Sequence, residues 1–362
     1  MGKIEPQPGI MNIALYQSGA AHVPGVDNVI KLSSNENPYG PSPKAVEAVR
    51  NAAAQMHRYP NTDHTSLRAA IGEAHDMDPD RIICGVGSDE IIHFLCQAYA
   101  GPGDEVLHTE HGFSMYKISA MAAGATPVEV KERERVTDVD ALLAGCTERT
   151  RLVFIANPNN PTGTMISEAE VARLADNIPP QAILVLDGAY AEYVEGFDAG
   201  KALIDARSNV FMTRTFSKLY GLGGIRVGWG YGPREIIDVL NRIRGPFNVN
   251  GMAIAAGMAA VRDRDFVTRS IEHNDTWLPW VTAELEKLGL KVTPSVGNFV
   301  LVHFPDEDGK RAADADAYLL ERGCVLRMVG NYGLPNSIRM TIGSEDANRA
   351  IIGHLKDFLE QK

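Results

Sequence analysis

The sequence predicts an α/β protein with two domains. The large domain would contain a doubly wound, mostly parallel sheet, and the smaller domain would be α+β. Three continuous apolar runs, at residues 152–156, 183–186 and 209–212, predict strands that are buried on both faces of such a sheet. Helix-like segments lie between these runs, as a doubly wound fold requires. A chain of 362 residues also exceeds the roughly 250–300 residues at which a single core stops growing.

We expect three segments along the chain. Residues 1–34 are irregular and rich in proline and glycine, and they predict an arm that packs with the small domain. Residues 35–259 would form the large, ligand-binding domain. Residues 260–362 would form the small C-terminal domain, with strands near residues 300–303 and 337–341.

The large domain is predicted to begin with a helix and a strand-turn-helix unit. Ser42 followed by Pro43 predicts a helix start. Residues 81–84 predict a short strand, which leads through the glycine turn at residues 85–87 into an apolar helix. Free backbone amides at such a helix start can bind a phosphate. The polar residues 88–90 could equally serve only as helix cap and dipole partners.

Polar residues follow each of the three buried runs. Asn157 follows the first run, Asp187 follows the second, and the third leads into a segment that contains Lys218. Shorter strands, predicted at residues 106–108 and 126–128, would extend the sheet. Because ligands gather at the carboxyl ends of strands in doubly wound sheets, we expect the three polar residues in one crevice. Singly, each could be a turn residue or a strand terminator.

Lys218 is the candidate catalytic residue. Its apolar neighbours predict desolvation, which lowers the pKa of an amine and makes it a nucleophile toward a carbonyl. Thr215 and Ser217 could donate hydrogen bonds to a phosphate, and Arg226 offers a planar fork of donors. Together these groups fit pyridoxal 5'-phosphate, an aldehyde that carries a phosphate and forms a Schiff base with lysine. Alone, the segment could be a surface lysine before a glycine-rich turn.

The chemistry of this cofactor suggests roles for the other polar residues. Asp187 would keep the pyridine nitrogen protonated, so that the ring can accept electrons from the substrate carbon. Asn157 and Tyr190 would hydrogen-bond the phenolic oxygen. Phe113 could stack on the ring or could be an ordinary core aromatic.

Composition argues against several other classes of protein. The net charge of −11 gives no electrostatic footprint for nucleic acid or for an anionic membrane. The four cysteines lie far apart without a CxxC pair, so neither a zinc site nor a disulfide framework is indicated. The sequence also lacks a secretory signal and any run of about 18 apolar residues. We therefore expect a cytoplasmic protein without metal, nucleic-acid or membrane partners.

The chain resembles the fold type I pyridoxal phosphate-dependent aminotransferases in an ordered set of segments. These segments are residues 35–43, 85–90, 113–116, 157–163, 187–193, 215–226 and 337–343. They are spread over nearly the whole chain, and the set is specific for fold and cofactor but less so for substrate. Within this family the chain is most similar to the members that act on histidinol phosphate.

The resemblance implies a role for each matching residue at the cofactor. Lys218 would be the Schiff-base lysine and proton carrier, Asp187 would pair with the pyridine nitrogen, and Tyr190 would contact the phenolic oxygen together with Asn157. The remaining implied cofactor contacts are Gly87, Ser88, Asp89, Phe113, Thr215, Ser217 and Arg226. Tyr59 would reach across a homodimer interface to the partner's cofactor phosphate. At residues 111–112 the sequence has His-Gly where many relatives have Pro-Thr.

The resemblance also implies a substrate pocket. Arg339 would bind the α-carboxylate and Arg327 the substrate phosphate, with Asn37 and Tyr16 completing the set. A lone arginine on a strand is more often solvated, and Tyr16 could simply anchor the arm. In the implied ping-pong cycle, glutamate donates the amino group and leaves as 2-oxoglutarate, and imidazole acetol phosphate then accepts the group to become histidinol phosphate.

Three alternatives stay open at the level of sequence. An aromatic amino-acid aminotransferase would share the cofactor residues and differ only in the substrate pocket. A threonine-phosphate decarboxylase would also resemble this chain, and release of carbon dioxide would reveal it. The ligand-sensing half of a transcription regulator should carry a DNA-binding domain and a basic surface, whereas about 35 residues precede the predicted body here.

Overall fold

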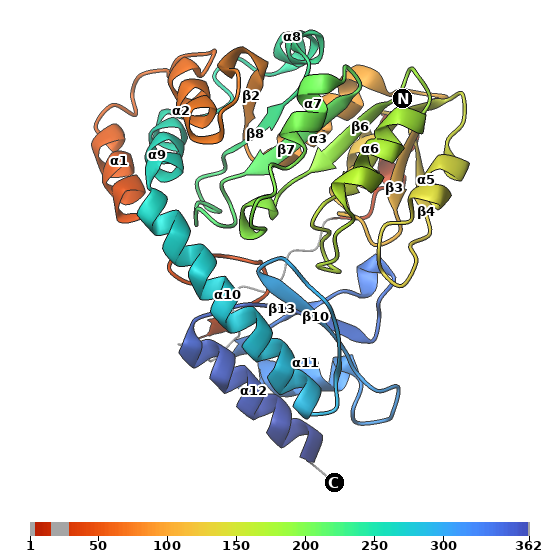
Figure 1. The fold of residues 1–362 in the computed structure, drawn as a ribbon, viewed down its shortest axis with the longest axis vertical. Coiled ribbons are helices and arrows are strands. Elements are labelled where there is room, and N and C mark those ends of the chain that lie inside the picture. The colour runs from red at the N-terminus through yellow and green to blue at the C-terminus, as the bar shows by residue number, and fades with distance from the viewer. Residues whose placement is uncertain (1–3, 16–28, 361–362) are drawn as a thin grey trace.

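The computed structural model describes residues 4–15 and 29–360, which form two bodies joined by one long helix (Figure 1). The larger body contains a seven-stranded sheet and the smaller a four-stranded sheet. Helix α10 (Arg264–Lys287) runs from the larger body into the smaller one. This arrangement confirms the predicted α/β class with a separate α+β C-terminal region. Among the described helices, none has both the length and the apolarity that a membrane span requires.

The large sheet is parallel except for one strand. Its strands, in spatial order, are β2 (Ile82–Gly85), β8 (Gly228–Tyr231), β7 (Val210–Thr215), β6 (Ile183–Asp187), β5 (Thr150–Ala156), β3 (Glu105–Thr109) and β4 (Thr126–Val130). Strand β8 pairs antiparallel with both of its neighbours, while the other pairs are parallel. All but β8 overlap the runs that the sequence predicts.

Strand β8 escapes prediction because its alternate residues are glycines. A Cβ on Gly230 would lie 2.6 Å from the ring of Phe211 on β7, and a Cβ on Gly228 would collide with the backbone nitrogen of Ser88. The strand therefore needs glycine for close packing, although glycine is normally depleted in strands. Its place in the sheet depends on these tertiary contacts.

The sheet is buried on both faces, as its continuous apolar strands require. Along β5, Leu152 and Phe154 pack in one core cluster, and Val153 and Ile155 pack in the other. The first face is covered by α3 (Ser88–Tyr99), α4 (Met115–Ala122) and α8 (Arg234–Ile243). The other face is covered by α2 (Thr65–His75), α5 (Val139–Gly145), α6 (Glu168–Asn177), α7 (Lys201–Ala206) and α9 (Gly251–Arg262).

Helix α1 (Pro43–Ala53) begins where the sequence predicts. The hydroxyl of Ser42 accepts a hydrogen bond from the backbone N–H of Lys44 at 3.1 Å, with Pro43 at the first helical position. The same hydroxyl donates to Asp263, whose other carboxylate oxygen pairs with the Lys44 amine at 2.8 Å. These bonds attach α1 to the start of α10.

The smaller body packs helices against an antiparallel sheet. Its sheet has the order β12 (Arg327–Met328), β13 (Ser337–Thr341), β10 (Phe299–His303) and β9 (Lys291–Thr293). Helices α10, α11 (Ala312–Leu320) and α12 (Glu345–Glu360) contribute to its core. The short 3-10 helices of the chain are η1 (Ile10–Asn12), η2 (Pro79–Arg81), η3 (Ala191–Tyr193) and η4 (Gly330–Tyr332).

The end of the N-terminal arm lies against this smaller body. Strand β1 (Ile30–Lys31) pairs in parallel with β11 (Cys324–Val325), and Leu32 belongs to the same core cluster as α12. We propose on this basis that residues 29–34 and 260–360 belong to the small domain and residues 35–259 to the large one. The described start of the arm lies elsewhere, because Gln7 lines a cavity with His93 and Gln97 of α3 in the larger body.

Candidate active site

A cavity of about 520 Å³ lies at the carboxyl ends of β5, β6 and β7. This is where a doubly wound sheet is expected to bind its ligand. The cavity is lined by Ser34, Glu36, Ser88, Asp89, Phe113, Met115, Ala156, Pro158, Asn160, Asp187, Ala189, Tyr190, Thr215, Ser217, Lys218, Gly223 and Arg226. Most of the predicted cofactor residues are therefore brought together here.

Lys218 follows β7 and is half-buried at this cavity. Its amine donates a hydrogen bond to the carbonyl oxygen of Ser34 at 2.9 Å and lies 5.9 Å from the centre of the Tyr190 ring. Burial, with a smaller contribution from the positive charge of Arg339, lowers the pKa of the Lys218 amine to about 8. A much larger fraction of this amine than of an ordinary lysine is therefore unprotonated near neutral pH, as a nucleophile toward an aldehyde requires.

Asp187 is the last residue of β6 and is held by two donors. The Tyr116 hydroxyl donates to Oδ2 at 2.7 Å, and the backbone N–H of Ala189 donates to Oδ1 at 3.1 Å. Burial raises the pKa of this carboxyl, while the bond from Tyr116 acts in the opposite direction. The sequence did not reveal this role of Tyr116, because the contact joins α4 to a strand 71 positions further along the chain.

The start of α3 lines one end of the cavity, where the sequence predicts phosphate binding. Gly87 has φ +90°, and a Cβ there would lie 2.6 Å from Nη2 of Arg226 and would collide with the Asp89 side chain. Nη2 of Arg226 pairs with Oδ1 of Asp89 at 3.0 Å, and its Nη1 lies 3.4 Å from the Ser217 hydroxyl. The Asp89 carboxylate would repel a phosphate, so Asp89 can contribute its backbone amide and orient Arg226. The hydroxyl of Thr215 accepts from the Ser217 N–H at 3.1 Å.

Asn157 faces away from this cavity. Its Oδ1 accepts from the backbone N–H of Ile166 at 3.0 Å, and its Nδ2 donates to the Ile166 carbonyl at 3.1 Å. Asn160 lines the cavity instead, and its Oδ1 accepts from Nη1 of Arg339 at 2.5 Å. This corrects the prediction for Asn157, because the loop turns after β5 and presents the later asparagine. Three asparagines in seven residues gave no signal by which to choose among them.

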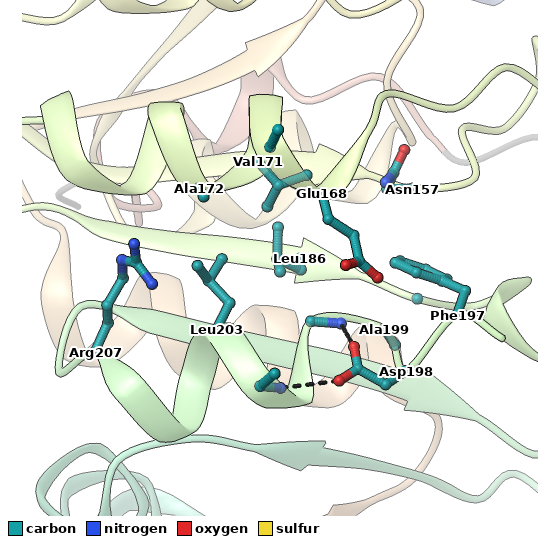
Figure 2. Close-up of a pocket in the computed structure, with 14 residues that line it drawn as sticks. Asn157, Glu168, Val171, Ala172, Leu186, Phe197, Asp198, Ala199, Leu203 and Arg207 are labelled. Atoms are coloured by element: carbon teal, nitrogen blue, oxygen red, sulfur yellow. Dashed lines mark hydrogen bonds between the residues drawn. The ribbon is translucent and has the colours of Figure 1, made fainter.

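Asn157 borders a second cavity, of about 370 Å³, between α6 and α7 (Figure 2). Its walls are largely apolar and include Val171, Leu186 and Leu203. The Asp198 carboxylate at its rim accepts the backbone N–H groups at the start of α7, at 2.7 and 2.9 Å. The lining residues include no lysine, histidine or cysteine, so this cavity does not offer the nucleophile of the first one.

Asn37 is also placed away from the cavity. Its Nδ2 donates to the Leu219 carbonyl at 2.6 Å and to the Ser270 hydroxyl at 2.9 Å, while its Oδ1 accepts from the Tyr39 N–H at 2.9 Å. Both amide protons are thus used within the protein. The structure therefore corrects the prediction of a substrate contact: Asn37 attaches the turn after the arm to the loop that carries Lys218.

The two predicted substrate arginines lie side by side in the small sheet. Arg339 on β13 and Arg327 on β12 are paired in register. Arg339 is buried and donates from Nη2 to the Ser33 carbonyl at 2.6 Å, in addition to its bond to Asn160. Arg327 is half-buried. Tyr16 lies outside the described residues.

Two further predicted residues have informative positions. The Tyr59 side chain is 82% exposed and stacks on Phe247 with ring centres 4.5 Å apart. Phe113 lines the cavity and meets the Tyr116 ring edge to face at 5.9 Å. Just before it, Nδ1 of His111 lies 2.7 Å from the Tyr332 carbonyl oxygen. A side chain of the larger body therefore contacts the smaller one here.

Comparison with known proteins identifies the class. The family described as aminotransferase class I and II matches residues 27–355, so the chain belongs to this family. The chain is 68% identical to a histidinol-phosphate aminotransferase of Ruegeria sp. (strain TM1040), over 99% of this chain and 98% of that protein. It is 63% identical to a histidinol-phosphate aminotransferase of Ruegeria pomeroyi, over the full length of both.

A solved structure supports the same assignment. Histidinol-phosphate aminotransferase from Sinorhizobium meliloti, in complex with pyridoxal-5'-phosphate, superimposes with a TM-score of 0.88. The two chains are 25% identical, and the match covers 99% of this chain and 98% of that one. The fold and family predicted from the sequence are confirmed.

Proposed function

We propose that this chain catalyses the histidinol-phosphate aminotransferase reaction of histidine biosynthesis with pyridoxal 5'-phosphate as cofactor. The reaction interconverts histidinol phosphate and 2-oxoglutarate with imidazole acetol phosphate and glutamate. One observation carries the proposal: an amine of lowered pKa, Lys218, shares a cavity with the buried carboxylate of Asp187 and a phosphate-binding helix start. The relatives at 68% and 63% identity support the choice of substrate.

The residues of the cavity fit this cofactor group by group. When bound, pyridoxal phosphate supplies an electrophilic aldehyde and a ring that accepts electrons. The amine of Lys218 would bind the aldehyde carbon, and the Asp187 carboxylate would hold a proton on the pyridine nitrogen. Tyr190 and Asn160 would hydrogen-bond the phenolic oxygen. The phosphate would be held by Gly87, Ser88 and the amide of Asp89, with Thr215, Ser217 and Arg226.

Lys218 is also the group placed to move the proton. An amine with a pKa near 8 can accept a proton from the substrate carbon and return it near neutral pH, which is the condition for efficient general acid-base catalysis. Its hydrogen bond to the Ser34 carbonyl holds the amine at the cavity. Phe113 would exclude water from one face of the ring.

The substrate would lie between the cavity and the small sheet. Arg339 is fixed by Asn160 and by the Ser33 carbonyl, and its planar guanidinium can bind a carboxylate through two bonds. Arg327, beside it in register, is the proposed partner of the substrate phosphate. In this assignment the same pocket accepts the α-carboxylate of glutamate in one half of the cycle and histidinol phosphate in the other.

The proposal includes a cytoplasmic homodimer. The exposed stack of Tyr59 on Phe247, with Met56 nearby in sequence and 70% exposed, supports a protein contact at this surface. In the dimer the partner subunit's Tyr59 would reach the cofactor phosphate. Each of the four cysteines is a free thiol, as a reducing compartment favours.

A comparison of amino donors tests the substrate assignment. Histidinol phosphate, tyrosine and phenylalanine are each supplied with 2-oxoglutarate, and glutamate formation is measured under steady-state conditions. We expect the largest kcat/KM for histidinol phosphate. An equal or larger value for tyrosine or phenylalanine would assign the chain to the aromatic aminotransferases, and carbon dioxide release from threonine phosphate would assign it to the decarboxylases.

A further inference from the structure

Asn35 lies between the two bodies and bonds to both of them. It is completely buried, and its backbone is in the left-handed region with φ +57°. Its Nδ2 donates to the Tyr190 hydroxyl of the larger body at 2.8 Å. Its Oδ1 and its backbone N–H both contact the Thr341 hydroxyl of β13, at 3.0 and 2.9 Å. Its carbonyl accepts from Nδ2 of Asn298 at 3.0 Å.

The direction of each bond follows from the donors and acceptors that these groups offer. A backbone N–H can only donate, so the Thr341 oxygen must accept from Asn35. With Oδ1 of Asn35 facing Thr341, the threonine hydroxyl proton has an acceptor. With the amide nitrogen there instead, that proton would have no acceptor among the described residues. The amide nitrogen therefore faces Tyr190 and donates to its hydroxyl oxygen.

It follows that the Tyr190 oxygen accepts a hydrogen bond from Asn35, so the hydroxyl proton of Tyr190 must point elsewhere. Within the described part of the chain, the Tyr190 oxygen has no second hydrogen-bond partner, and the residue lines the Lys218 cavity. We propose that Asn35 and Thr341 are positioning residues that fix Tyr190 as a hydrogen-bond donor into this cavity. This inference rests on the proposed function, in which Tyr190 faces the phenolic oxygen of the cofactor.

The electrostatics of the site agree with a donor role. Burial raises the pKa of Tyr190 to about 12, against smaller lowering contributions from the charge of Arg339 and the bond from Asn35. The charged groups that face Tyr190 are Arg339, Asp187 and the Lys218 amine over its ring. The phenol therefore keeps its proton at neutral pH and can donate it in a hydrogen bond.

The arrangement also links Tyr190 to the position of the small sheet. Thr341 belongs to β13, which also carries Arg339 two residues earlier. Asn298, which bonds the Asn35 carbonyl, directly precedes β10 of the same sheet. Strand β13 thus carries both Arg339, the proposed carboxylate-binding residue, and Thr341, which would fix the direction of the hydrogen bond that Tyr190 donates.

The test is the pKa of the visible chromophore of the bound cofactor, measured by absorbance against pH. A donor to the phenolic oxygen stabilises the form in which that oxygen is negative, so its loss raises this pKa. We expect Thr341→Val to raise the pKa of the chromophore by about 1, equivalent to about 1.4 kcal/mol. We expect the same increase for Asn35→Gly, because glycine can keep the left-handed backbone. Tyr190→Phe should raise it at least as far, and Thr341→Ser should behave as the wild type.

A double variant and a control make the result specific. Thr341→Val combined with Tyr190→Phe should titrate as Tyr190→Phe alone, because the proposed effect passes through the tyrosine hydroxyl. Thr293→Val, which removes a buried hydroxyl of β9 in the same sheet, should leave the chromophore unchanged. If Thr341→Val does not fold, the chromophore pKa of Asn35→Gly tests the inference in its place.

Two results would overturn the inference. One is that Thr341→Val and Asn35→Gly both keep the wild-type chromophore pKa while Tyr190→Phe raises it. The other is that the changes in chromophore pKa caused by Thr341→Val and Tyr190→Phe add up in the double variant. A wild-type protein that forms no chromophore with pyridoxal phosphate would instead contradict the proposed function, so the two failures can be told apart.

Discussion

The Tyr116 hydroxyl donates to Oδ2 of Asp187 at 2.7 Å, from a side chain that is completely buried. The ring is stacked on Phe154 of β5 with centres 4.8 Å apart and planes 9° apart. Core packing of α4 against the sheet therefore sets the position of a hydroxyl that serves the active site. The bond also partly offsets the cost of burying the Asp187 carboxylate.

Tyr116→Phe tests this relationship in the cofactor-free protein, because it keeps the ring and removes the donor. Burial already raises the pKa of Asp187 above its unfolded value, and loss of the bond should raise it further. A carboxyl with a raised pKa lowers the free energy of unfolding when the pH lies above its pKa in the folded state. This loss of stability disappears as the pH falls below the pKa of the same carboxyl in the unfolded state. We expect a loss of about 1–3 kcal/mol in urea unfolding at pH 7, and less at pH 4. The control is Tyr318→Phe, which removes a tyrosine hydroxyl from α11 in the smaller body. An equal loss at both pH values for Tyr116→Phe, or a similar loss for the control, would contradict this account.

Lys218 should be the residue that borohydride traps with pyridoxal phosphate. Its amine becomes reactive as it loses its proton, so the rate of trapping should rise with pH and level off above about pH 8. An ordinary lysine would level off only near pH 10.4. Peptide mapping after reduction identifies the modified residue. Lys218→Ala should abolish trapping and turnover, whereas Lys201→Ala, outside the cavity, should preserve both. Trapping on a different lysine would refute the assignment.

Asn160→Ala and Asn157→Ala form a matched pair. Asn160 lines the cavity, so its loss should weaken pyridoxal phosphate binding about 5- to 10-fold, as expected for one hydrogen bond of about 1–1.4 kcal/mol. Asn157 satisfies both backbone groups of Ile166, so its loss should cost about 1–3 kcal/mol of stability with little change in affinity. Cofactor titration and urea unfolding measure the two effects. Weaker cofactor binding in Asn157→Ala, with unchanged binding in Asn160→Ala, would support the sequence-based prediction that Asn157 contacts the cofactor.

Arg327→Leu should separate phosphate substrates from others. A charge-assisted bond contributes about 1.5–3 kcal/mol, so kcat/KM for histidinol phosphate should fall about 10- to 100-fold. Phenylalanine, which has no phosphate, should lose far less. Arg339→Leu should lower the rate with glutamate as well, because the α-carboxylate depends on it. Equal losses for histidinol phosphate and phenylalanine in Arg327→Leu would show that this arginine has a structural role.

Mixed dimers test the role of Tyr59. Tyr59→Phe should bind the cofactor weakly, and Lys218→Ala should be inactive. A heterodimer of the two contains one intact site, built from Lys218 of one chain and Tyr59 of the other. We therefore expect activity to return on mixing, measured against each variant alone after chain exchange has been verified. If verified heterodimers stay as inactive as their parents, the tyrosine does not cross the interface.

Local patterns were sufficient to predict most of the sheet and to bring Asp187 and Lys218 together as candidates for one cavity. The runs that form β5, β6 and β7 are continuous and apolar because both faces of these strands are buried. Asp187 and Lys218 could be recognised because each follows such a run, and parallel strands end at the same edge. Strand β8 could not, because its glycines are required by Phe211 and Ser88, which come from other elements.

By itself the sequence determined the fold class, the family and the cofactor, since these depend on hydrophobic periodicity and on short ordered motifs. It also singled out Lys218 as the candidate lysine, which the structure places in the cavity. Only the tertiary structure decided which asparagine faces the cavity, that Asn37 bonds Leu219 and Ser270, and that Asn35 bonds Tyr190 and Thr341. Those outcomes depend on hydrogen-bond partners that are distant in sequence: Asn35 bonds residues 155 and 306 positions away. A side-chain amide looks the same in sequence whether it meets a ligand, a backbone group or a tyrosine, and only the folded chain supplies its partner.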